Sequence, residues 1–406
     1  MNILFLSTWF PHPPDNGSKL RVYHLLRGLA ERHEVTLLSF AFATARPDAP
    51  GELDAWCRAV RTVPIDPYEA NRAGTLHTFL SPRPVASRPI AAMSRLAAET
   101  LAARPFDAVI ASTGMTIDYA LAAPPGVVRV LEEHNAMTRW AWEDYRQATG
   151  ALSRARRWLS WRKNRWYETR TFSRFDLLTM VSEADRQATA DALGRRGPRV
   201  EVVPNGVDCA HNRPGLARPR PAALVFNGSL TYSANYDAMR WFLAEVWPRI
   251  RAQIPEATLA ITGSTAGVDL AGLALDDRVT LLGFVEDVRI PVAEAAVAVA
   301  PIRQGGGTRL KILEAMALGT PVVATSKGAE GHDVIDGQHL LLADDPQPFA
   351  AAVLRLLADD ALAARLRRNA RQLVEQRYDW HTIGRRFLAL VEETVQAQRP
   401  LSSDGS

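Results

Sequence analysis

Residues 301–325, PIRQGGGTRLKILEAMALGTPVVAT, give the strongest fold signal in the chain. An apolar strand is predicted to end at Ala300, a glycine-rich turn follows, and a helix is predicted over residues 308–318, beginning at Thr308. Another apolar strand is expected at 321–324. Apolar strands separated by helices favour a parallel sheet that is covered on both faces. The glycines of the turn are Gly305, Gly306 and Gly307.

The same turn is the best candidate for an anion-binding site. Bare glycine backbone at a helix N-terminus lets N–H groups approach an anion closely, and the helix dipole favours negative charge. Arg309 and Lys311 add positive charge, and Glu314 follows Lys311 at the i+3 position, where its carboxylate can accept from ribose hydroxyls. The alternative is a glycine turn in front of an ordinary surface helix.

Outward from this segment, short apolar runs alternate with segments of helical spacing such as 19–31. The strands predicted before the middle of the chain cover 2–7, 34–40, 107–111, 127–132, 177–181 and 200–203. Those predicted after it cover 223–227, 258–262, 279–282, 297–300, 321–324 and 340–342. Residues 41–90, rich in Ala, Arg and Pro, are predicted to be an irregular excursion. The fold class is therefore α/β with two doubly wound, Rossmann-like halves.

The chain of 406 residues is too long for one ordinary core. The predicted division is a first domain at 1–205, a linker at 206–222 rich in Pro, Gly and Arg, and a second domain at 223–380. Residues 381–406 are expected to form a helix that crosses back to the first domain and ends in a disordered tail. Two such domains place a cleft between them, and ligands sit beyond the carboxyl ends of the strands.

Composition narrows the class of protein. The hydrophobic fraction of 47% is that of a globular chain. Cys57 and Cys209 form no framework, and no Cys/His cluster has metal-ligand spacing, so we expect a cytoplasmic protein without zinc. The apolar N-terminal run has no basic n-region, and no run of about 18 apolar residues occurs, so neither a signal peptide nor a membrane-spanning helix is expected. A net charge of +4 does not indicate a nucleic-acid partner.

Four motifs along the chain resemble the retaining glycosyltransferases of family 4, which have the GT-B fold. They are PPDNGS at 13–18, VSE at 181–183, PNGVD at 204–208 and LEAMALGTPVVA at 313–324. The patterns GGGTRLKILEAMA and FNGSLTYSANYDA are similar to bacterial sugar transferases of polysaccharide and exosortase-associated clusters.

The resemblance implies two Rossmann-like domains facing each other across a cleft, with the acceptor side at 1–205 and the nucleotide-sugar side at 223–380. The implied activity moves a sugar from a nucleotide-sugar donor to a glycan, lipid-linked or small-molecule acceptor, in polysaccharide or glycoconjugate biosynthesis. The donor is a co-substrate, and neither a cofactor nor a metal is implied.

The resemblance also implies site residues. His134, at the end of a predicted strand in the segment EEHN, is expected to be a catalytic residue that contacts the donor sugar or the acceptor, with Glu133 as a second polar candidate. A packing or surface role is the alternative. Gly17 belongs to a loop beside the donor phosphates, or else to a plain turn with a Ser18 cap. The further donor-binding candidates are Gly305, Gly306, Gly307, Thr308, Glu314, Val285 and Glu330.

Two departures from the family pattern bear on the donor site. The family's first glutamate, eight positions before Glu314, falls on Gly306. The loop at 227–235, NGSLTYSAN, lacks the Arg and Lys that neutralise the diphosphate in the family. Because a leaving diphosphate needs charge stabilisation, Arg309 and Lys311 are predicted to take over that catalytic role.

Two other functions remain open on this scaffold. One is a nucleotide-sugar 2-epimerase, which would not require an acceptor. The other is a non-catalytic nucleotide-sugar-binding subunit, which the glycine at position 306 would suit.

Residues 153–175 form a basic, Trp-rich segment that is predicted to be helical. Its composition is that of an interfacial helix, so peripheral contact with an anionic membrane is one reading. A solvated helix whose tryptophans pack on the first domain is the other. The basic residues are Arg154, Arg156, Arg157, Arg162, Lys163, Arg165, Arg170 and Arg174, and the tryptophans are Trp158, Trp161 and Trp166.

Overall fold

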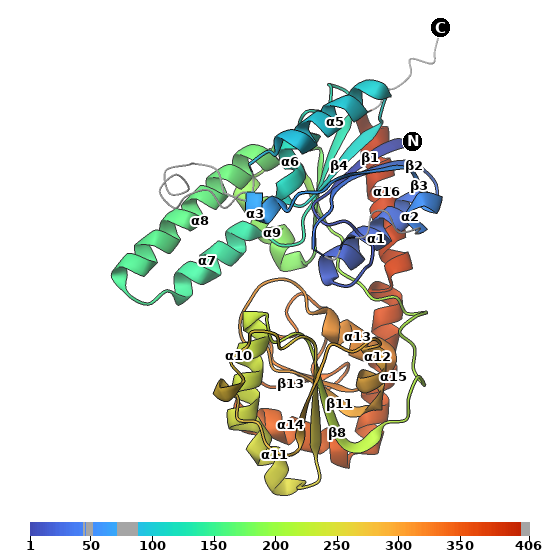
Figure 1. Ribbon diagram of the computed structural model, residues 1–406. Helices are drawn as coiled ribbons and strands as arrows, with labels where there is room; N and C mark the ends of the chain where they lie inside the picture. Colours follow the sequence, from blue (N-terminus) through green and yellow to red (C-terminus); the bar gives the residue numbers. More distant parts are fainter. Residues whose placement is uncertain (44, 46–51, 71–87, 399–406) are drawn as a thin grey trace. The chain divides into compact units, whose positions relative to one another are not determined.

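The computed structural model describes residues 1–43, 45, 52–70 and 88–398 (Figure 1). The chain divides into two compact units. The first comprises Met1–Pro204 together with the C-terminal residues from Ile383, and the second is Asn205–Thr382. The expected disordered tail at 399–406 lies outside the described residues.

The first unit is built on a seven-stranded parallel sheet in the order β3-β2-β1-β4-β5-β6-β7. Its inner strands are almost wholly buried, as strands covered on both faces must be, and apolar side chains such as Ile3, Phe5 and Ile110 fill them. The strands are β1 (Asn2–Ser7), β2 (Glu34–Phe40), β3 (Cys57–Val63), β4 (Ala108–Ser112), β5 (Val128–Glu132), β6 (Leu177–Met180) and β7 (Arg199–Val202).

The interpretation of 41–90 as an irregular excursion is wrong at Cys57–Val63, which forms strand β3. Within the described part of the chain, β3 is the edge strand of the sheet and pairs with β2. An edge strand needs no continuous apolar run, and CRAVRTV mixes charged and apolar residues. The part of the excursion at 71–87 lies outside the described residues.

Helices cover both faces of this sheet (Figure 1). They are α1 (Gly17–Ala30), α2 (Glu52–Trp56), α3 (Pro67–Ala70), α5 (Ala91–Ala103), α6 (Ile117–Ala120), α7 (Met137–Gln147), α8 (Ala151–Phe172) and α9 (Glu183–Leu193). The last helix, α16 (Trp380–Gln398), begins in the second unit and belongs to the first from Ile383 onward. It approaches α1 closely, since a Cβ added at Gly28 would lie 2.9 Å from the Cα of Gly384.

Two of these helices, α7 and α8, form an antiparallel hairpin that extends away from the sheet of the first unit (Figure 1). The basic segment predicted at 153–175 is helical only to Phe172, because Arg174 and Phe175 turn back toward β6. Trp158 and Trp166 are about half exposed, at 46% and 50%, whereas the ring of Trp161 packs against that of Trp142 in α7, with ring centres 4.8 Å apart and planes tilted by 48°. The reading in which the tryptophans pack on the first domain therefore fits Trp161, whereas Trp158 and Trp166 keep about half of their surface exposed.

The second unit has a six-stranded parallel sheet in the order β10-β9-β8-β11-β12-β13. The strands are β8 (Arg220–Asn227), β9 (Thr258–Thr262), β10 (Val279–Gly283), β11 (Ala295–Ala300), β12 (Val322–Ala324) and β13 (Leu341–Leu342). The helices are α10 (Ser233–Trp241), α11 (Trp247–Gln253), α12 (Arg289–Glu294), α13 (Leu310–Leu318), α14 (Pro346–Ala358) and α15 (Asp360–Arg377). A Rossmann-like parallel sheet in each unit confirms the predicted α/β fold class.

The helix predicted to begin at Thr308 begins two residues later, at Leu310. Arg309 is the N-cap residue and is extended, with φ −95° and ψ 90°. Its side chain turns back onto the carbonyl groups of the glycine turn, which holds this stretch out of helical geometry.

Among the described residues, no helix is long and apolar enough to cross a membrane.

Candidate functional site

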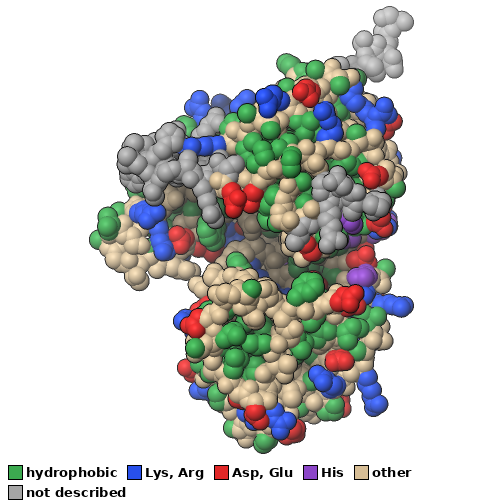
Figure 2. Space-filling model, viewed as in Figure 1, with side chains coloured by type: hydrophobic (Ala, Val, Ile, Leu, Met, Phe, Trp, Pro, Cys, Tyr) green, Lys and Arg blue, Asp and Glu red, His purple; other side chains and the backbone are tan. Residues whose placement is uncertain are grey.

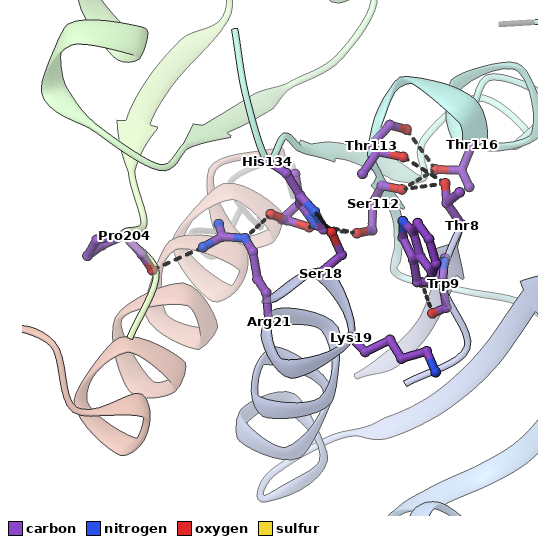
Figure 3. Close-up of polar contacts among 12 residues, drawn as sticks. Thr8, Trp9, Ser18, Lys19, Arg21, Ser112, Thr113, Thr116, His134 and Pro204 are labelled. Atoms are coloured by element: carbon purple, nitrogen blue, oxygen red, sulfur yellow. Dashed lines mark hydrogen bonds and ion pairs between the residues drawn. The ribbon is translucent and has the colours of Figure 1, made fainter. Parts of the chain in front are cut away.

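The first group of predicted site residues lies where α1 begins and where β4 and β5 end (Figure 3). The imidazole of His134 contacts three side chains. Its Nε2 lies 3.2 Å from Glu132 Oε2 and 3.3 Å from Ser112 Oγ, and its Nδ1 lies 3.4 Å from Ser18 Oγ. His134 is therefore part of an ordered polar cluster at the carboxyl edge of the sheet, where ligands bind in α/β folds.

Glu132 holds this cluster together. Arg21 Nε donates to Glu132 Oε1 at 2.5 Å, and both side chains are fully buried. Burial alone would raise the pKa of Glu132, but Arg21, His134 and the hydrogen bond from Ser112 together hold the pKa well below its usual range. His134 thus faces a carboxylate that stays ionised, and Nε2 is the ring nitrogen that donates to it.

Gly17 lies beside this cluster, in the first turn of α1. Asn16 caps that helix, because its side chain accepts from the backbone N–H of Lys19 at 3.1 Å. The prediction of a Ser18 cap is wrong, since Ser18 is one residue inside the helix and its hydroxyl reaches His134 instead. The structure thus brings Gly17 and His134 to the same corner of the first unit.

The second group lies in the other unit, around the glycine turn of residues 305–307. Arg309 Nη2 donates to the carbonyl oxygen of Gly305 at 2.8 Å, and Arg309 Nη1 donates to the carbonyls of Gly306 and Gly307. Gly305 has φ +92°, and a Cβ there would meet the hydroxyl of Tyr232 at 2.9 Å, so this position requires glycine. Arg309 is mostly buried and fixes the conformation of the turn.

Lys311 points to a different loop, the one that follows β8. Its Nζ donates to Asn235 Oδ1 at 2.9 Å and lies 3.9 Å from the centre of the Phe226 ring. A Cβ added at Gly228 would be 2.6 Å from this Nζ, so the amine sits directly against the backbone there. Burial and, to a lesser extent, the charge of Arg309 lower the pKa of Lys311, Glu314 opposes them, and the resulting pKa is about 7.

Glu314 lies in the same pocket of polar groups. Asn227 Nδ2 donates to Glu314 Oε2 at 2.8 Å, and Thr262 Oγ1 donates to Asn227 Oδ1 at 3.0 Å. Burial raises the pKa of Glu314, and Lys311 and Asn227 counteract the rise. Lys311, Glu314 and the two asparagines therefore meet beneath the loop that lacks the family's cations.

The remaining candidates are spread around the second unit. Thr308 Oγ1 accepts from Asn205 Nδ2 at 2.7 Å. Val285 is half-buried in the loop after β10, next to Phe284, whose side chain is 88% exposed. Glu330 forms an ion pair with Lys327 at 2.6 Å in the segment after β12.

Several residues of these two clusters were not singled out from the sequence. Their signal was faint, because each acts through a partner distant in the sequence: Arg21 and Glu132 are 111 positions apart, and Asn227 and Glu314 are 87 apart. Only the position of Asn227 and Glu132 at strand ends pointed to them. The residues missed are Arg21, Ser112, Glu132, Asn227 and Asn235.

Family models match both halves of the chain. The model described as Glycosyltransferase Family 4 matches residues 16–211, and the model described as Glycosyl transferases group 1 matches residues 221–359. The chain belongs to glycosyltransferase family 4. In this family-4 chain, the first match covers the His134 cluster and the second covers the Lys311 cluster.

The alignments with two curated relatives cover about half of this family-4 chain. Glycogen synthase of Mycobacterium tuberculosis is 32% identical over 222 residues, which are 51% of this chain and 52% of that protein. Phosphatidyl-myo-inositol mannosyltransferase of Mycolicibacterium smegmatis is 32% identical over 224 residues, which are 52% of this chain and 56% of that protein. The chain thus spans about half the length of the curated relatives it matches.

A solved structure extends the likeness to nearly the whole fold. An Anabaena protein, solved in complex with UDP, superposes with a TM-score of 0.70 at 18% identity, covering 97% of this chain and 100% of that one. With two Rossmann-like units and this neighbour, the fold of the family-4 chain is GT-B.

Proposed function

We propose that the chain is a retaining, metal-independent glycosyltransferase that moves a sugar from a nucleotide-sugar donor to a glycan, lipid-linked or small-molecule acceptor. We place this reaction in polysaccharide or glycoconjugate biosynthesis. The observation that carries the proposal is the Lys311 amine against the backbone of Gly228, in the loop after β8. A cation at this place can neutralise a donor diphosphate. The Anabaena neighbour, whose structure contains UDP, supports this class of ligand.

Charge on the departing diphosphate is the main chemical demand of the reaction. Lys311 and the backbone N–H groups of the glycine turn supply the stabilisation, and Arg309 contributes by fixing the turn. The bond from the anomeric carbon to the phosphate oxygen breaks while the acceptor oxygen approaches on the same face. The departing phosphate oxygen takes the proton of the acceptor hydroxyl, so the chain needs neither a nucleophile nor a metal.

We assign residues to the other parts of the donor from their places in the two units. Glu314 accepts from the ribose hydroxyls, and Val285 and Glu330 lie in loops that follow strands β10 and β12. Because Gly306 replaces the family's first glutamate, the donor sugar depends on other polar groups. His134 contacts that sugar or the acceptor hydroxyl, and the ionised Glu132 keeps its imidazole oriented.

The α7–α8 hairpin is the surface we assign to peripheral contact with an anionic membrane. It exposes large apolar side chains that include Trp140, Trp158 and Trp166, beside exposed arginines that include Arg156 and Arg162. Figure 2 shows hydrophobic and Lys or Arg side chains next to one another on this hairpin. Interfacial aromatics mixed with cations suit the headgroup layer of an anionic bilayer.

A thermal-shift screen against nucleotide sugars tests the proposal. UDP-glucose, GDP-mannose and the free diphosphates UDP and GDP are the probes, and one donor with its diphosphate should raise the melting temperature by mass action. Glu314→Ala should abolish the shift from the diphosphate itself, whereas Arg355→Ala, which removes an exposed cation from α14, should not. No shift with any of the probes would contradict the proposal.

A further inference from the structure

A cavity lies in the first unit, at the base of the α7–α8 hairpin. Its volume is about 260 Å³, and its wall is largely apolar, with Trp9, Met137 and Phe172 among the lining residues. Two acids, Glu133 and Glu168, line the same cavity. His134 and Ser18 line it as well, so the cavity adjoins the polar cluster of Figure 3.

The two acids are held at fixed places in this apolar wall. Glu133 directly follows β5 and is 6% exposed. Glu168 is on α8, and its carboxylate accepts from the backbone N–H of Thr138 at 3.1 Å and from the Thr138 hydroxyl. Both side chains therefore line the cavity, Glu133 buried and Glu168 half-buried.

No Lys or Arg is among the described residues that line the cavity. Its one basic side chain, His134, turns Nε2 to Glu132 rather than to Glu133 or Glu168. The contrast with Glu132 is sharp, because that carboxylate, one residue earlier, has the guanidinium of Arg21 at 2.5 Å. The described lining residues of the cavity thus include two acids and no Lys or Arg to match them.

Ionisation of these acids is costly in this largely apolar surrounding. Burial raises the pKa of Glu133, and the charges of Glu168 and Glu132 raise it further. Burial also raises the pKa of Glu168 to about 7, although the hydrogen bonds from Thr138 oppose the rise. A neutral ligand that displaces water would leave both acids protonated, whereas a ligand cation lets them ionise and pairs with them.

We propose that this cavity binds the acceptor substrate and that the acceptor presents a protonated amine to Glu133 and Glu168. The aromatic wall suits the same ligand, because Trp9 and Tyr68, with ring centres 5.8 Å apart, both line the cavity and aromatic rings attract cations. That the ligand is the acceptor rests on the proposed glycosyl transfer. The amine site itself does not.

Three sugars that differ in one substituent test whether the cavity recognises a protonated amine. We would measure equilibrium binding of glucosamine, glucose and N-acetylglucosamine to the full chain at pH 7 and equal ionic strength. Glucosamine should bind at least about tenfold more tightly than the other two, because charge-assisted hydrogen bonds exceed neutral ones. Affinities of the three sugars within about twofold of one another would overturn the proposal.

Substitutions of the two acids test whether they are the groups that bind the amine. Glu133→Gln and Glu168→Gln should each remove the preference for glucosamine, and Glu99→Gln, which neutralises an exposed acid on α5, should keep it. A preference that survives in both of the first two variants would overturn the proposal. If these variants do not fold, the pH dependence of glucosamine binding to the wild-type chain serves as the test. The affinity should rise between pH 5 and pH 7 as the acids ionise. An affinity that does not change over this range would overturn the proposal.

The assay separates this inference from the proposed function. A chain that binds nucleotide sugars but has no preference for glucosamine loses only the amine site. A chain that prefers glucosamine but binds no nucleotide sugar keeps the amine site and loses the glycosyl transfer.

Discussion

Lys311 is a buried amine whose environment opposes its charge. Its pKa is lowered to about 7 by burial, and its partners within the chain are an amide oxygen and an aromatic face. A bound diphosphate would add the negative charge that Glu314 supplies only in part. The residue therefore links donor binding to protonation.

Removing that amine should weaken the binding of nucleoside diphosphates. We expect Lys311→Ala to raise the Kd of UDP or GDP, whichever the chain binds, by about tenfold or more, since a charge-assisted contact contributes about 1.5–3 kcal/mol. Arg309→Ala should have a similar effect because the turn loses its anchor. Titration calorimetry measures both constants, and values within twofold of wild type would refute the assignment.

The pKa of Lys311 predicts a pH dependence with a definite sign. The amine is charged below about pH 7 and neutral above it, and a bound diphosphate raises the pKa. Binding at pH 8 should therefore take up a proton, and affinity should fall as pH rises through the range 7 to 8. Calorimetry in buffers of different ionisation enthalpy counts the proton, and Lys311→Ala serves as the control. Equal proton uptake by wild type and variant would contradict the prediction.

At the scale of elements, the contact between α1 and α16 is made by two glycines. A Cβ at Gly28 would lie 2.9 Å from the Cα of Gly384, inside the limit for heavy atoms. In an open helix, Gly→Ala stabilises by about 0.5–1 kcal/mol. Here Gly28→Ala should instead destabilise by about 1–3 kcal/mol, because the helices must move apart. Urea denaturation followed by circular dichroism gives the sign, and a more stable variant would show that the helices do not pack this tightly.

The exposed arginines of the α7–α8 hairpin predict how strongly the chain binds anionic lipid. Arg156, Arg162 and Arg165 are exposed, whereas Arg157 is paired with Asp144 at 2.7 Å. Each juxtamembrane cation contributes about 1 kcal/mol on anionic lipid, so replacing these three by Gln should weaken vesicle binding by about a hundredfold. Co-sedimentation with phosphatidylglycerol and phosphatidylcholine vesicles across a salt series measures it.

A matched control separates local from overall charge. Arg95, Arg195 and Arg196 are exposed elsewhere on the first unit, and their replacement by Gln makes the same change in net charge. This control should bind anionic vesicles nearly as wild type does. Equal losses in the two triple variants, or no binding of wild type at low salt, would remove the hairpin's role.

At the scale of the whole molecule, hydrophobic runs predicted most of the fold. Buried strands such as β1 and β4 are continuous apolar segments, so their positions could be located from the sequence. The edge strand β3 could not, because a strand exposed on one side does not need that pattern. The lateral order of the strands also needed the structure, since it depends on pairing between residues far apart in the chain.

The site was predictable in part for the same reason. Glycines and charged residues after strands marked the turn at 305–307 and the segment around His134. The direction of a long side chain was not predictable: Arg309 turns to its own glycine carbonyls, and Lys311 reaches under another loop. Those directions are set by tertiary contacts with Asn235, Phe226 and the turn itself.

The decisive measurement is the transfer of labelled sugar from the donor found by thermal shift, assayed in EDTA with and without a glycan and glycolipid extract. We expect incorporation that requires the extract, persists in EDTA, retains the anomeric configuration by NMR and is lost in Lys311→Ala. Donor conversion without the extract would point to an epimerase. A complete loss of activity in EDTA that added metal restores would contradict the account.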